Sequence, residues 1–140
     1  MRLLRFVGLF AVILGCAAWA MAQESTAAKT TRKKLQQKIT VEFKDEGTKA
    51  VIDQVAGEMD KAPKFRIDNA SGVSNNTKIT YKAKDKTVEQ ILNEICDKLD
   101  CGWYVVSNDA NNKVDGSVVI RKSTKGKERG YEAGKEPKDK

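Results

Sequence analysis

The clearest pattern of apolar and polar residues lies in the stretch Lys78–Val106. Its first residues alternate between apolar and polar, which is the period of a strand with one buried face. Thr87 follows as a candidate helix cap, and Gln90 stands where it would complete a capping box. Apolar residues then recur at helical spacing and form one stripe: Val88, Ile91, Leu92, Ile95 and Leu99. The stretch therefore predicts a strand, an amphipathic helix and a second strand at Trp103–Val106.

A second strand-and-helix pattern comes before this stretch. Ile39, Val41 and Phe43 alternate with polar residues, and a helix is expected over Thr48–Asp60 because apolar residues recur there at helical spacing. Two further short strands are expected, at Lys64–Asp68 and Ser117–Arg121, each bounded by turn-forming residues. The pattern predicts one α+β domain over residues 39–121 with the element order β-α-β-β-α-β-β.

The N-terminal segment, residues 1–22, has the features of a secretory signal peptide. It begins with two arginines, continues with an uncharged apolar run and ends in Ala20-Met21-Ala22, a candidate cleavage site. Two alternatives stay open, which are lipid attachment at Cys16 and an uncleaved N-terminal membrane anchor. All three predict that the body of the protein is exported, to the periplasm or outside the cell. After cleavage, no membrane span is expected.

Both flanks of the predicted domain are basic. Residues 23–38 predict a basic flexible leader, and residues 122–140, a Lys/Glu/Gly run, predict a disordered tail. The formal net charge of the chain is +7, yet residues 39–120 hold eleven basic and fourteen acidic side chains. Because the positive charge lies in the flanks, the folded domain is not expected to bind nucleic acid.

Residue types that carry catalysis are scarce. The sequence has no histidine, which removes the commonest general base and metal ligand. It also has no glycine-rich loop of the kind that holds phosphates. We therefore predict a protein that is not an enzyme, with no catalytic residue, metal site or cofactor.

Cys96 and Cys101 are the pair of thiols in the predicted domain. Four residues separate them, which is not the spacing of a thiol oxidoreductase or a zinc ribbon. Three interpretations stay open: a disulfide, which an oxidising compartment would permit, two packed thiols, and catalytic redox work.

Several phrases of the predicted domain resemble the short N-terminal (STN) domain shared by secretins and TonB-dependent receptors. The first is ITVEFKD, beginning at Ile39, with the helix that follows it, and the second is ITYKAKDKTVEQIL, beginning at Ile79. CGWYV, beginning at Cys101, stands where that family has an apolar strand containing tyrosine. The resemblance implies an α+β sandwich in which two helices pack on small mixed sheets. It also implies a role in docking one envelope protein to another, and it brings no catalytic residues.

The favoured function is an exported, non-catalytic module that docks to another envelope protein. Outer strands of small sheets leave main-chain groups unpaired, and a partner can add a strand there. The candidate edges are the strands at Lys64–Asp68 and Ser117–Arg121, with four contact residues: Lys64, Arg66, Val119 and Arg121. The alternative is a small envelope redox or hydrolytic protein that uses Cys96 and Cys101 or surface carboxylates.

Overall fold

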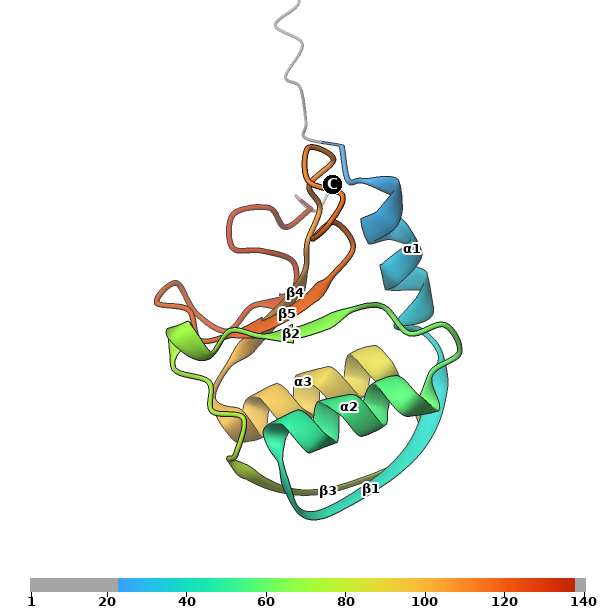
Figure 1. Ribbon diagram of the computed structural model, residues 1–140, viewed down its shortest axis with the longest axis vertical. Helices are drawn as coiled ribbons and strands as arrows, with labels where there is room; N and C mark the ends of the chain where they lie inside the picture. Colours follow the sequence, from blue (N-terminus) through green and yellow to red (C-terminus); the bar gives the residue numbers. More distant parts are fainter. Residues whose placement is uncertain (1–22, 138–140) are drawn as a thin grey trace, which may run out of the picture.

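The computed structural model describes residues 23–137 and has a mixed α+β fold, as predicted. Two helices, α2 (Thr48–Glu58) and α3 (Val88–Leu99), lie side by side between a two-stranded sheet and a four-stranded sheet (Figure 1). The predicted signal peptide and Cys16 lie outside the described residues.

The two-stranded sheet pairs β1 (Lys38–Gly47) with β3 (Lys78–Thr87) in antiparallel register. Both strands show the same alternation of buried and exposed side chains. The buried positions face the helices, as the period of two requires, and they are Ile39, Val41, Phe43, Ile79, Tyr81 and Ala83. The other face is polar and exposed, which confirms the predicted half-buried strands.

The units β1–α2 and β3–α3 repeat one another. Asp45 and Asp85 lie at matching shifts in the strand register and both have positive φ, 53° and 52°. The Asp45 N–H donates to Thr80 Oγ1 at 3.1 Å, and the Asp85 N–H donates to Thr40 Oγ1 at 3.1 Å. This reciprocal pair of bonds fixes the strand register from both ends.

Helix α3 begins and packs as its sequence predicts. The Gln90 N–H donates to Thr87 Oγ1 at 3.2 Å, and the Thr87 N–H donates to Gln90 Oε1 at 3.1 Å. This is the predicted capping box. The helix ends at Asp100, which has left-handed backbone geometry with φ 53°.

The four-stranded sheet has the order β2-β5-β4-β6. Its strands are β2 (Phe65–Ile67), β5 (Val118–Arg121), β4 (Gly102–Val105) and β6 (Arg129–Gly130). β5 is antiparallel to β4, whereas β2 is parallel to β5 and β6 is parallel to β4. A 3-10 turn, η1 (Asn69–Ser71), follows β2. The inner face of this sheet covers the helices and completes the core.

The prediction of a flexible leader over residues 23–38 is wrong, because helix α1 (Thr26–Lys34) lies there and packs against the domain. Ser25 caps the helix by accepting from the Ala28 N–H at 3.1 Å. Thr31 Oγ1 donates to the Gly116 carbonyl at 2.6 Å, and Leu35 is buried just after the helix. The buried face of α1 consists of small and polar residues, so it carries no apolar stripe that would identify it in the sequence.

The prediction of a disordered tail over residues 122–140 is wrong for its described part, which ends at residue 137. The Glu128 carbonyl accepts from the Trp103 N–H at 3.1 Å, and β6 follows directly. Arg32 of α1 donates to the Gly130 carbonyl at 2.6 Å and stacks on the Tyr131 ring at 3.7 Å. Polar contacts with distant residues thus hold the tail, and its composition does not reveal them.

Glu94 of α3 joins its helix to β3. Tyr81 donates to Glu94 Oε2 at 2.5 Å, and Lys86 Nζ donates to Oε1 at 2.8 Å. The bonds from Lys86 and Tyr81 lower the pKa of Glu94 below its usual value near 4.5. A carboxylate with a lowered folded pKa stabilises the fold above its unfolded pKa, and this stabilisation is lost as the pH falls through the folded pKa.

We therefore expect a Glu94→Gln variant to be less stable than the wild type near neutral pH by under about 1 kcal/mol, since this pair is partly exposed. The difference should shrink as the pH falls from about 5 to about 3. Urea unfolding across this range measures it. Glu58→Gln, on α2, serves as the control, and its free energy of unfolding should vary with pH as that of the wild type does. A Glu94→Gln difference that stays constant with pH would contradict the assignment.

Candidate functional site

The strand β5 is not an edge, so one of the two predicted docking edges is wrong. It lies between β2 and β4 and pairs with both. Val119 is on the outer face of the sheet and 7% exposed, and Arg121 pairs with Glu128 and stacks over the Tyr104 ring at 4.6 Å. β2 pairs with β5 in parallel and so occupies the edge that β5 would otherwise leave free. The order of elements along the chain does not reveal this pairing.

The strand β2 is an edge of the four-stranded sheet, and its hydrogen bonds show which main-chain groups are free. The Val118 N–H donates to the Lys64 carbonyl at 2.8 Å, and the Asp68 N–H donates to the Ile120 carbonyl at 2.9 Å. Alternate residues of a parallel strand turn their main-chain groups to the same side, so those of Arg66 face β5. The N–H and C=O groups of Phe65 and Ile67 therefore point away from the sheet.

This geometry corrects the expected role of Arg66. Its main chain belongs to the internal ladder, so proline at this position would break the pairing with β5 rather than block the free edge. The side chains alternate in the opposite sense. Phe65 and Ile67 are half-buried and pack against the core, while Lys64 and Arg66 are exposed on the outer side.

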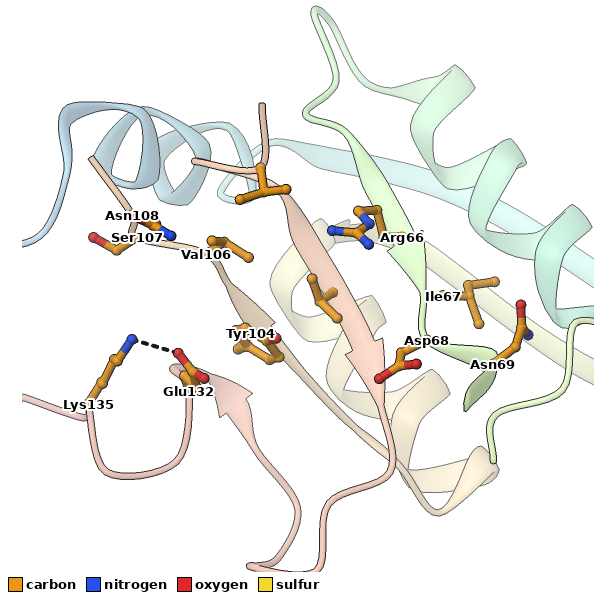
Figure 2. A pocket seen from close by; sticks show the side chains of 12 residues that line it. Arg66, Ile67, Asp68, Asn69, Tyr104, Val106, Ser107, Asn108, Glu132 and Lys135 are labelled. Carbon is orange, nitrogen blue, oxygen red and sulfur yellow. Dashed lines mark ion pairs between the residues drawn. The ribbon is translucent and has the colours of Figure 1, made fainter. Parts of the chain in front are cut away.

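The outer face of the sheet beside β2 forms a groove of about 630 Å³ (Figure 2). Its apolar lining includes Tyr104, Val106 and Val119. The β2 side contributes Arg66, Asp68 and Asn69 to the lining. The opposite wall is the tail, where Lys135 Nζ lies 2.8 Å from Glu132 Oε2. The groove is therefore apolar at its base and polar along its rim, and it begins directly at the candidate edge.

A second cavity, of about 480 Å³, lies between α1 and the start of β2. Lys34, Lys64 and Lys113 contribute to its lining. The acid among its lining residues, Asp115, accepts from Ser25 Oγ at 2.5 Å and from the Asn108 N–H at 3.0 Å. These bonds lower the pKa of Asp115 and keep it ionised. The cavity thus adds lysines to the same side of β2.

The edges of β1 and β3 differ from that of β2. Each is ten residues long, and the register shifts at Asp45 and Asp85 interrupt it. Bulges and lysines protect edges from pairing with other strands, and exposed lysines occur along both strands. We therefore take β2, with its adjoining groove, as the candidate docking site.

Cys96 and Cys101 are free thiols in the structure, so it contains no disulfide between them. Both lie at the end of α3, where the Cys101 N–H donates to the Cys96 carbonyl at 3.0 Å. Cys96 is fully buried and Cys101 is 2% exposed. A hydrogen bond to Cys101 and burial raise the pKa of the Cys96 thiol, whereas the bond from Cys96 lowers the pKa of Cys101. Burial shields both sulfur atoms from any substrate.

We expect thiol titration to find two free thiols per chain in the protein that begins at Gln23, after unfolding without a reductant. The folded protein should react far more slowly with the same reagent, because both sulfur atoms are covered. Cys101→Ser identifies the contribution of each thiol. Finding no free thiol after unfolding would instead establish the disulfide.

The remaining candidates to consider in residues 23–137 are a metal site, the surface carboxylates and a membrane-spanning helix. No cluster of three or more potential metal-ligating side chains occurs among them. The surface carboxylates of α3 are used in contacts: Glu94 binds Lys86, Asp97 binds Arg129, and Asp100 lies 3.1 Å from Lys127. No helix in this part of the chain has the length and apolar character needed to cross a membrane.

Comparisons with known proteins return no relative. No family model matches the chain, and neither the curated proteins nor the solved structures contain a match.

Proposed function

We propose that this chain is an exported, non-catalytic docking module that binds another envelope protein by accepting one of its strands at the free edge of β2. The observation that carries the proposal is the main chain of Phe65 and Ile67, which lies at the margin of an exposed groove and has no hydrogen-bond partner within residues 23–137. The resemblance of residues 39–121 to the STN domain supports the same role.

Strand addition suits this edge physically. Two residues with outward N–H and C=O groups can form up to four main-chain hydrogen bonds with a partner strand, and neighbouring side chains then provide selectivity. The edge is short, follows Pro63 and carries exposed Lys64 and Arg66. These features oppose self-association of two such edges, because like charges would face each other. The edge is thereby kept available for a different chain.

The covered thiols and the paired carboxylates support a binding role over a redox or hydrolytic one. A redox protein needs a thiolate that its substrate can reach, and a hydrolase needs a carboxylate free to accept a proton. The contacts of Cys96, Cys101 and Glu94 leave none of these groups free for that chemistry.

The proposal can be tested by photo-cross-linking in the native host followed by amide exchange. A photoreactive residue at Arg66 should capture a specific envelope protein, while the same residue at Lys82, on the other sheet, should not. With the captured protein added, the Phe65 and Ile67 amides should exchange at least about tenfold more slowly, because hydrogen-bonded amides are protected.

Two variants separate the main-chain contribution from the side-chain contribution. Ile67→Pro removes an outward N–H, whereas Ile67→Ala keeps the N–H and removes most of the side chain. Circular dichroism checks that both variants fold. If Ile67→Pro binds the captured protein as well as Ile67→Ala does, strand addition at β2 is wrong.

A further inference from the structure

We infer that the segment accepted at β2 is acidic and alternates acidic with apolar residues, as in Glu-Val-Glu-Val-Glu. This inference rests on the proposed function and adds the chemistry of the partner. It follows from the side chains that flank the free edge and from the charges that have no partner around it.

The alternation follows from sheet geometry. Side chains at matched positions of neighbouring strands lie on the same face of a sheet. Partner side chains beside Lys64 and Arg66 would therefore lie on the outer face, whereas those beside Phe65 and Ile67 would lie on the inner face. The half-buried Phe65 and Ile67 side chains favour apolar neighbours there. On the outer face, the charges of the neighbouring side chains determine which partner residues are favoured.

The net charge around the edge is positive. Within residues 23–137, no ion pair or side-chain hydrogen bond engages four cations beside the two cavities: Lys34, Lys64, Arg66 and Lys113.

The nearby acids are fewer than these four cations, and of the three only Glu132 has a charged partner, whereas Asp68 and Asp115 accept from uncharged donors. Asp68 Oδ1 accepts from the Ser71 N–H at 3.3 Å, Asp115 accepts from Ser25, and Glu132 pairs with Lys135. A basic segment would place like charges opposite Lys64 and Arg66, so an acidic segment is favoured.

A nucleic acid would also meet these cations, but it would leave the outward groups of Phe65 and Ile67 without a strand to pair with. The groove also offers little stacking surface, because its aromatic side chain, Tyr104, is buried beneath Arg121. The protein segment therefore accounts for both the main-chain edge and the charge.

Synthetic peptides test the inference on the chain that begins at Gln23. Three acetylated peptides serve as probes: Glu-Val-Glu-Val-Glu, its rearrangement Glu-Glu-Glu-Val-Val, and Lys-Val-Lys-Val-Lys. Amide NMR titration reports both affinity and protection at Phe65 and Ile67. The alternating acidic peptide should bind about three- to tenfold more tightly than the basic peptide, which is the range expected for two exposed charge pairs. It should also bind more tightly than the rearranged peptide, which has the same charge but cannot keep its acidic side chains on one face.

Charge reversal supplies the matched control. Arg66→Glu should weaken binding of the acidic alternating peptide and strengthen binding of the basic one by about two- to fivefold each. Lys44→Glu changes the net charge equally on β1, where Lys44 is exposed, and should alter neither affinity. An oligothymidylate of fifteen nucleotides measures attraction to a polyanion that has no strand main chain.

The outcomes distinguish the two levels of the proposal. If all three peptides protect Phe65 and Ile67 with equal affinity, strand addition stands and the acidic preference is wrong. If no peptide protects these amides and the photo-cross-linked protein does not either, the proposed docking edge itself is wrong. Oligothymidylate binding at Arg66 as tightly as the acidic peptide would overturn the assignment to a protein segment.

Discussion

Replacing Leu35 with alanine should lower the free energy of unfolding by about 2–4 kcal/mol, because this side chain is 1% exposed and its removal leaves a cavity. Leu35 follows α1 and connects it to α3, since its carbonyl accepts from the Glu89 N–H at 3.0 Å. The Val88 N–H, in the same first turn, donates to the Gln37 carbonyl at 3.0 Å. The segment before β1 therefore supplies hydrogen-bond acceptors for two N–H groups in the first turn of α3.

Urea unfolding monitored by circular dichroism measures this effect. Lys33→Ala, at an exposed position of α1, is the control and should change stability by less than about 0.5 kcal/mol. Equal stability of Leu35→Ala and the wild type would mean that residues 23–38 do not pack on the domain, which is what their composition alone predicts.

Replacing Glu128 with alanine should lower the free energy of unfolding by about 1–3 kcal/mol, because it leaves the partly exposed Arg121 without its partner. The Glu128 side chain is nearly inaccessible, and its two carboxylate oxygens accept from Arg121 at 2.8 and 3.1 Å. This bidentate pair raises the pKa of Arg121 and joins β5 to the tail.

A double-mutant cycle isolates the pair. Arg121→Ala should also lower the free energy of unfolding. The double variant should lower it by less than the sum of the two single variants, because it leaves no unpaired buried charge. Lys135→Ala, which breaks the exposed pair with Glu132, is the control and should cost under about 1 kcal/mol. Additive effects of Arg121→Ala and Glu128→Ala would show that the tail is not held by this contact.

The packing of the α1 segment and of the tail also determines which edge of the four-stranded sheet is open. The tail places β6 beside β4, and Arg32 of α1 binds the Gly130 carbonyl directly after Arg129. Gly102 permits this approach, because a Cβ added there would lie 2.6 Å from the Glu128 nitrogen. With β4 covered in this way, β2 is the longer exposed edge of that sheet.

The sequence by itself determined the parts of the fold that depend on local periodicity. The alternation in β1 and β3, the stripe of α3 and its capping box at Thr87 are properties of neighbouring residues, so the chain displays them without its fold. The repeat of Lys-Ile-Thr at Lys38 and Lys78 was also available as a signal of the two related units.

Only the tertiary structure decided that the flanking segments are ordered and which strand edge is free. The α1 and tail segments are polar, and several of the contacts that hold them join residues far apart in the chain, 85 positions for Thr31 with Gly116, 98 for Arg32 with Gly130 and 28 for Arg129 with Cys101, which composition does not encode. The same reason explains the edges. Val119 and Arg121 lie in an interior strand because β2 pairs with β5 from the far side, whereas Phe65 and Ile67 keep outward main-chain groups. Strand neighbours are chosen by packing between distant segments, and side-chain alternation is the same at an edge and inside a sheet.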